Sequence, residues 1–267
     1  MRALPMLVVL ALLGCNPLSA WGRKGHQILA HLALKDLPPD PAAWFKGLED
    51  IVADHSSDPD EWKNDREEGP RHFLDMDLYG NDVPFHLEEA RAKVGAKVFQ
   101  RAGQLPWVIQ DRVAILAKAF QAGHRQEVAL QTAFLSHYVG DLHVPLHTVE
   151  NYDGNLTGQH GVHSRWETGL VDRMAGTPDV RPATLEPEQL KELWRWLKAS
   201  NGLVPALLAD DKASSQGGQG PSGSYWLMFN QRQGPSVKEQ LAEAGQHTAQ
   251  LIILAWSMAG QPAVPKA

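Results

Sequence analysis

Two pairs of metal-binding residue types have the same spacing of four residues. His137 and Asp141 form the first pair, and His163 and Glu167 form the second. Residues four apart project from one face of a helix, so each pair can direct an imidazole nitrogen and a carboxylate oxygen to one point, and both atoms are good zinc donors. One such pair alone is more often a surface hydrogen bond. Two pairs within about thirty residues favour a metal centre, because buried carboxylates are unfavourable unless paired or metal-bound.

Other histidines lie close to these pairs. His147 follows Asp141 by six residues, beyond the helix-breaking Pro145, so the chain can return to the same point. His143 lies between them, and its position fits either support of a ligand or contact with a substrate. The remaining histidines have no partner pattern: His31, His55, His86, His124 and His247 are interpreted as packing or surface residues, and His160 is left unassigned.

Helices are predicted to position nearly all of these residues. In residues 25–35, for example, Ile28, Leu29 and Leu32 have the spacing of an amphipathic helix. The same periodicity predicts helices over residues 42–53, 87–100, 104–122, 125–139, 162–174, 186–199 and 237–259, with irregular segments at 54–80 and 140–161 and a surface loop at 214–224. The sequence has no internal repeat, domain linker or run of alternating strands, so we predict a single all-α domain.

The first twenty residues are typical of a secretory signal. A basic start at Arg2 precedes an apolar run that is too short to cross a bilayer, and Leu18-Ser19-Ala20 suits signal peptidase. We therefore expect a signal peptide at residues 1–20, a mature domain at residues 21–267, and a secreted or periplasmic protein. The alternative is a lipoprotein anchored at Cys15, because Leu-Leu-Gly-Cys resembles a lipidation signal.

Cysteine use and net charge limit the function further. Cys15 is the only cysteine, so the mature chain has neither a disulfide nor a thiolate ligand. The formal net charge is -6, and loss of Arg2 with the signal makes it -7. This negative net charge argues against binding of a polyanion through a broad basic surface. Metal ions could still reverse the charge locally, so a phosphate substrate is not excluded.

The order of these motifs resembles a known superfamily. Trp21-x4-His26, then His72, then HYVGDLHVPLH and then GVHSRWE follow one another as in zinc-dependent single-strand nucleases of the phospholipase C/nuclease superfamily. The resemblance covers nearly the whole mature chain. It implies an all-helical fold of that type with three zinc ions, one of them held by the amino nitrogen and carbonyl oxygen of an N-terminal Trp. Cleavage after Ala20 would create that terminus at Trp21.

The resemblance also implies the ligands. The loop ligand is taken as Asp60, because DEWK (60–63) resembles the segment of the family with a basic residue three positions after the ligand, and Asp54 and Asp58 remain alternatives. The implied sets are Trp21, His26 and Asp141 for one zinc, His72, His137, Asp60 and a bridging Asp141 for the second, and His147, His163 and Glu167 for the third.

The implied reaction is hydrolysis of a phosphodiester by zinc-activated water. The residues expected to act in catalysis are Asp141, which bridges two zinc ions, Asp60, which orients the water, and Lys63, which contacts the transition state.

The substrate is the more open question. GDLHVPLH and YDGN (152–155) favour a nuclease, whereas Glu167, where the nucleases usually have Asp, and the following Val171-Asp172 resemble the phospholipases. We expect an endonuclease acting on single-stranded DNA or RNA. The alternative is a zinc-dependent phospholipase C acting on phospholipid, and the third hypothesis is a non-catalytic zinc-binding helical protein. No stable protein partner is implied.

Overall fold

The computed structural model describes residues 21–35, 37–62, 65–80, 82–178, 190–215 and 221–266, and its regular elements there are helices. Within these ranges there is no β-strand, and Leu74 and Gly103 form an isolated bridge. The predicted all-α fold is confirmed. The predicted signal, residues 1–20, and the predicted catalytic Lys63 lie outside the described residues. Of the helices described, none is long and apolar enough to cross a bilayer.

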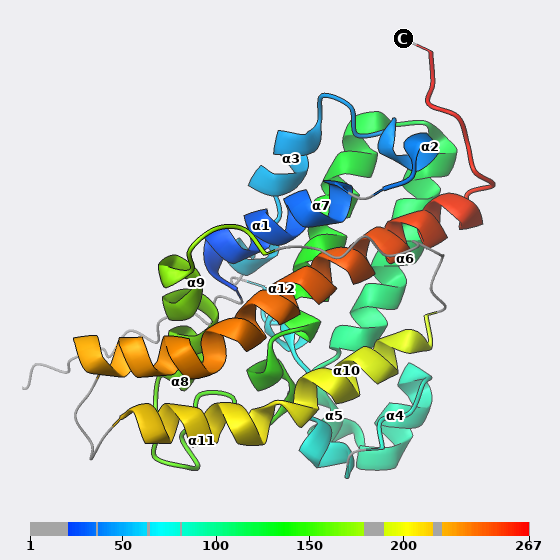
Figure 1. Ribbon diagram of the computed structural model, residues 1–267. Coiled ribbons are helices and arrows are strands. Elements are labelled where there is room, and N and C mark those ends of the chain that lie inside the picture. Colours follow the sequence, from blue (N-terminus) through cyan, green and yellow to red (C-terminus); the bar gives the residue numbers. More distant parts are fainter. Residues whose placement is uncertain are drawn as a thin grey trace, which may run out of the picture.

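The longest helices form the framework of the molecule. They are α1 (Gly22–Lys35), α6 (Leu105–Ala122), α7 (Arg125–Leu142) and α12 (Gly223–Met258). The α6–α7 hairpin turns at Gly123, whose φ of 74° places it in the left-handed conformation that ends many helices. Helix α12 packs against α1, α6 and α7, and α1 also contacts α7 (Figure 1). His137 and Asp141 thus lie near the end of a central helix.

Shorter elements surround this framework and supply most of the remaining predicted ligands. The α-helices are α2 (Pro39–Ala42), α3 (Glu49–Asp54), α4 (Leu87–Val94), α5 (Ala96–Arg101), α8 (Val162–Ser164), α9 (Leu170–Arg173), α10 (Glu192–Gly202) and α11 (Val204–Ser214). The 3₁₀ turns are η1 (Asp58–Glu61), η2 (Gly69–His72), η3 (Met76–Tyr79) and η4 (Pro145–Thr148), and η5 (Arg165–Gly169) is a π-helical turn.

Helix α12 is longer than predicted. It begins at Gly223 rather than near residue 237 and contains Pro235, which removes a backbone hydrogen bond. Its first turns carry Tyr225 and Phe229, which are buried in one apolar cluster with Trp166. The stabilisation from burying these side chains outweighs the cost of a proline inside the helix. Figure 1 shows α12 changing direction part-way along its length, as proline inside a helix commonly causes.

Other boundaries also differ from the prediction. The helix expected over residues 87–100 is two helices, α4 and α5, because Gly95 between them has a φ of 78°. The helix expected over residues 42–53 forms only from Glu49, after a run of turns. Helix α11 was not predicted at all. Conversely, α7 continues to Leu142, three residues past its expected end, and so places His137 and Asp141 in one regular helix.

The apolar interior consists of two clusters. The larger lies mainly among α3, α6, α7, α10 and the end of α12. The smaller contains Trp21 and Leu29 from the start of the described chain, Leu146 after α7, and Trp166. Helix α1 contributes to both clusters. Its first turns are therefore fixed between the core and the segments that carry the predicted ligands.

The crossing of α1 and α12 requires a glycine. A Cβ added at Gly245 would lie 2.7 Å from the Cβ of Leu32 and 3.5 Å from the backbone nitrogen of Ala33. Real Cβ atoms do not approach so closely, so the two helices would have to separate. Because α1 also carries His26, this contact helps to determine where that side chain lies.

We expect Gly245→Ala to lower the free energy of unfolding by about 1–3 kcal/mol, because overpacking at the crossing exceeds the gain of about 1 kcal/mol in helix propensity. Gly202→Ala is the matched control, because Gly202 is also helical and an added Cβ would have no atom within 4 Å. Urea unfolding at fixed zinc concentration measures both. Equal stability of Gly245→Ala and the parent would contradict a close-packed crossing.

Candidate metal centre

The structure brings the side chains of the predicted ligands together from separate elements. They come from α1 (His26), η1 (Asp60), η2 (His72), α7 (His137 and Asp141), η4 (His147), α8 (His163) and η5 (Glu167). Three groups of donor atoms form, each with its atoms within 4.8 Å of one another: His26, Asp60 and His137; His72, His137 and Asp141; and His147, His163 and Glu167. Each group has the imidazole and carboxylate composition of a zinc site.

Asp141 belongs to the second group and also lies near His26 of the first. Its Oδ2 is 2.8 Å from Nδ1 of His72 and 3.4 Å from Nε2 of His137. Its Oδ1 is 3.8 Å from Nε2 of His26. The two carboxylate oxygens therefore face different histidines. This is the arrangement required of a bridging ligand, and it places His26 and His72 on opposite oxygens of one carboxylate.

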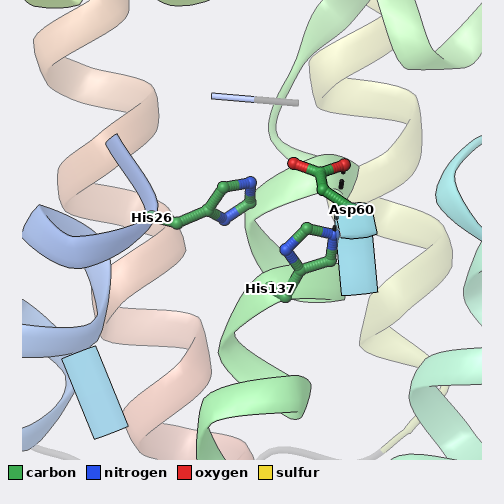
Figure 2. Close-up of side chains that lie close together, drawn as sticks. All are labelled: His26, Asp60 and His137. Carbon is green, nitrogen blue, oxygen red and sulfur yellow. Dashed lines mark ion pairs between the residues drawn. The ribbon is translucent and has the colours of Figure 1, made fainter. Parts of the chain in front are cut away.

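Asp60 faces the same region. Figure 2 shows His26, Asp60 and His137 pointing toward one another, with Oδ1 of Asp60 4.0 Å from Nε2 of His137. The rings of His26 and His137 stack with their centroids 4.2 Å apart. By contrast, Asp58 pairs with His55 at 2.7 Å and Asp54 accepts a hydrogen bond from Gln27. Of the three acidic residues considered for the loop ligand, Asp60 is thus the one that reaches the group.

The third group is compact and buried. Nε2 of His147 and Nε2 of His163 are 2.9 Å apart, and Nε2 of His163 is also 2.9 Å from Oε2 of Glu167. Nε2 of His147 lies 3.8 Å from the same oxygen. Glu167 lies on the π-helical turn η5, a rare conformation that is frequent at functional sites.

Trp21 is fully buried at the edge of the centre. Its indole N–H donates to the carbonyl oxygen of Gly140 at 2.7 Å, and its ring centroid lies 5.1 Å from that of Trp166. Its backbone N–H hydrogen-bonds with Glu167. The backbone nitrogen of Trp21 is therefore directed toward Glu167 of the third group, whereas its indole contacts Gly140, the residue before Asp141 on α7. Trp166 packs beside the ligands, as expected from its position next to Glu167.

Burial shifts the pKa values of most of these side chains. It raises the pKa of Asp141 to about 8 and also raises that of Glu167, while it lowers the pKa values of His137 and His147 well below their ordinary range. For His72, burial is outweighed by hydrogen bonds with Asp141 and Glu68, which raise its pKa to about 9.

These donors fit a cation. Oδ1 of Asp141 is buried and has no hydrogen bond among the described residues. The two close nitrogen pairs, at 2.9 and 3.0 Å, are near the separation of about 3.3 Å that two nitrogen ligands of a tetrahedral zinc would have.

In two of the ligands, His137 and His147, the second ring nitrogen is also held. Nδ1 of His137 hydrogen-bonds the carbonyl oxygen of Ser56 at 2.9 Å, and Nδ1 of His147 hydrogen-bonds that of His72 at 2.7 Å. A carbonyl accepts only from N–H, so both rings keep Nε2 unprotonated toward the centre when neutral.

Glu68 contacts a predicted ligand, and the sequence reasoning did not identify it. Its carboxylate lies 3.2 Å from Nε2 of His72 and 3.3 Å from Nε of Arg71, and it accepts a hydrogen bond from the hydroxyl of Tyr138. Because Nδ1 of His72 faces Asp141, Glu68 holds the opposite nitrogen and orients the ring. The available signal was the spacing of four residues between Glu68 and His72, which matches that of the recognised pairs.

A cavity of about 490 Å³ opens onto the centre. Asp60, His72 and His147 contribute to its wall together with two aromatic side chains, Phe73 and Tyr152. The cavity therefore combines metal-binding donors with flat apolar surfaces.

His143 and His247 differ from the prediction. His143 does not face the clusters or the cavity: its Nε2 lies 2.8 Å from Nδ1 of His247, whose ring stacks on Trp196 at 3.9 Å. His247 is thus packed inside rather than on the surface. His143 and His247 form a structural contact between α7 and α12. Of the other histidines, His31 and His86 are exposed, and His160 pairs with Asp153 at the surface.

Comparisons with known proteins agree with this arrangement. The solved structure of "Alpha Toxin from Clostridium Absonum" is similar, with a TM-score of 0.57 and 13% identity over 93% of this chain. This chain covers 66% of the toxin, somewhat less than two thirds, and at this identity the likeness concerns the fold alone. No curated protein matches the sequence.

The family comparison is more specific. The family model described as S1/P1 Nuclease matches residues 21–255, which begin at Trp21 and include every predicted ligand. That range is most of the sequence, and the chain belongs to the S1/P1 nuclease family.

Proposed function

We propose that this chain is a zinc-dependent endonuclease that is exported and cleaves phosphodiester bonds in single-stranded DNA or RNA. The observation that carries the proposal is the convergence of three groups of histidines and carboxylates around the buried Asp141, beside a cavity of about 490 Å³. Membership of a nuclease family supports hydrolysis of phosphodiester bonds as the reaction.

We propose three zinc ions, one for each implied ligand set. Bound zinc would supply positive charge for the phosphate oxygens and make water a nucleophile near neutral pH. The role of the protein is to fix the donors: Asp141 presents its two oxygens to different histidines, and Glu68 holds the ring of His72. Asp60, at the wall of the cavity, can accept a proton from the attacking water.

The cavity supports nucleic acid as the substrate. Phe73 and Tyr152 offer aromatic faces on which a base can stack, and Tyr152 is 38% exposed. Lys63 keeps its proposed role as a positive contact to the transition state. The alternative remains a zinc-dependent phospholipase C, which Glu167 in GVHSRWE favours from the sequence.

The substrate test uses the zinc-loaded protein starting at Trp21. We expect it to cleave single-stranded oligonucleotides, to release no phosphocholine from phosphatidylcholine, and to lose activity when zinc is chelated, because both the charge and the nucleophile depend on the metal. Product analysis on gels and by chromatography distinguishes these outcomes. Release of phosphocholine without cleavage of nucleic acid would favour the phospholipase. Zinc binding with neither activity would favour a non-catalytic zinc protein.

The free amino group of Trp21 is expected to bind one zinc. A protein with one glycine added before Trp21 should therefore bind about one zinc fewer per chain than the protein that starts at Trp21. Trp21→Phe with a free terminus is the control: it loses the indole bond to Gly140 but should keep its zinc content. Elemental analysis after gel filtration measures the ratio. Equal zinc content with and without the added glycine would contradict a ligand role for the amino group.

Glu68 is expected to act through His72. Glu68→Gln removes the negative charge beside Nε2 of His72 with little change in size, and we expect zinc affinity to fall by about 10–100-fold while the helical circular dichroism stays unchanged. Glu67→Gln is the control, because Glu67 is exposed one residue away. Titration with a competing chelator measures the affinity. A Glu68→Gln protein with parental zinc affinity would show that this carboxylate does not support the ligand.

A further inference from the structure

A second cavity lies beside the one that opens onto the metal centre. Its volume is about 450 Å³, and its wall includes three arginines, Arg66, Arg71 and Arg91, together with Gln100 and Gln104. We call it the arginine groove. None of its residues is a predicted metal ligand. Its volume is in the range of cavities that hold small-molecule ligands.

The arginine groove and the catalytic cavity share a wall. Arg66 lines both, and the following residues alternate between them: Glu68 and Gly69 line the catalytic cavity, whereas Pro70 and Arg71 line the groove. The opposite side of both comes from the end of α5 and the segment after it, with Arg101 at the catalytic cavity and Gln104 at the groove.

Backbone hydrogen bonds join the two sides. The N–H of Gln104 donates to the carbonyl of Pro70 at 2.7 Å, and the N–H of Asp75 donates to that of Ala102 at 2.8 Å. The two walls are therefore fixed to each other. A single nucleic-acid strand that left the catalytic cavity past Arg66 would meet the groove next.

The charge of the groove is opposite to that of the chain. The chain has a formal net charge of -6, whereas the groove has three guanidinium groups and one carboxylate, that of Glu67. Within the described residues, Arg66 and Arg91 form no ion pair, and both are exposed. Arg71 differs, because Glu68 holds its Nε at 3.3 Å. Guanidinium groups without a carboxylate partner are well suited to phosphate, which they bind through paired N–H donors.

We propose that the arginine groove binds the phosphate backbone of a single strand on one side of the bond that is cleaved. This inference rests on the proposed nuclease function and specifies its substrate as a chain of several nucleotides rather than one phosphodiester. The amide groups of Gln100 and Gln104 offer donors and acceptors for sugars or bases. Phe99, the aromatic residue of the groove, is 7% exposed, so the groove offers little apolar surface to an acyl chain.

Arg91 is the residue that tests the groove without disturbing the centre. Of the two cavities it lines only the groove, it is exposed on α4, and no hydrogen bond or ion pair joins it to a predicted ligand within the described residues. Lys118→Glu is the matched control for Arg91→Glu: both reverse one exposed helical charge, and Lys118 is fourteen residues along α6 from Gln104, about 21 Å away along that helix.

The experiment measures binding and cleavage separately with zinc-loaded protein. Binding is followed by the fluorescence anisotropy of a labelled single strand of about twelve phosphorothioate nucleotides, and cleavage is followed with the ordinary strand and with a dinucleotide. We expect Arg91→Glu to weaken binding of the long strand about tenfold at low salt, to reduce the salt dependence, and to leave dinucleotide cleavage unchanged. Lys118→Glu should change binding less than twofold.

The outcomes separate this inference from the proposed function. Cleavage of oligonucleotides with unchanged binding by Arg91→Glu would overturn the groove and keep the nuclease. Binding that depends on Arg91 without cleavage would keep the groove and overturn the nuclease. An equal loss for the long strand and the dinucleotide would show that Arg91 acts on the centre itself, and absence of both binding and cleavage would overturn both proposals.

Discussion

The carboxylate of Asp141 has no exposure to solvent, and the rest of the site follows from that burial. A buried carboxylate is stable only with cations or several hydrogen-bond donors around it. Histidines from α1, η2 and α7 itself lie within 4 Å of its two oxygens, and burial raises its pKa to about 8. The helices therefore meet around a group that needs a positive partner. Because the packing of the helices buries this carboxylate, the same packing favours the binding of a metal ion beside it.

The geometry around Asp141 depends on its neighbour Gly140. A Cβ at that position would lie 3.0 Å from Cδ1 of Leu29 and 3.2 Å from Cδ1 of Trp21. Without a side chain, α7 lets α1 approach and lets the indole of Trp21 bond to the carbonyl of Gly140. The motif GDLHVPLH thus has a structural reason for its glycine as well as a chemical reason for its aspartate. The same contact brings the backbone of Trp21 near Glu167, and so joins the first helix to the third group of ligands.

Local patterns in the sequence predicted the features that depend on local spacing. Helix periodicity located α1, α6 and α7. The four-residue spacing of His137 with Asp141 and of His163 with Glu167 correctly predicted that the side chains of each pair lie close together. Tertiary contacts explain the failures. The early start of α12 depends on burial of Tyr225 and Phe229, and His143 turns toward His247, a residue 104 positions away. Asp60, by contrast, was chosen over Asp58 from the resemblance of DEWK, and η1 places its carboxylate beside His26 and His137. Glu68 had a usable signal, but its role as a support becomes visible only beside His72 and Tyr138.

The distribution of charge explains how an acidic chain can act on a polyanion. At the centre, burial keeps the imidazoles of His137 and His147 neutral, whereas the pKa of His72 is raised to about 9 by its hydrogen bonds with Asp141 and Glu68. Because the groups also contain carboxylates, we expect the positive charge at the reacting phosphate to come mainly from metal, with Arg66 and Arg101 on the cavity wall. Farther along the same wall, Arg66 and Arg91, which form no ion pair within the described residues, offer charge that is independent of metal. On the proposed function, the reaction would depend on the metal ligands, whereas retention of the strand would depend on the arginines of the groove, which are not ligands. A chain with a net charge of -6 can therefore repel nucleic acid over most of its surface and still attract it along one path.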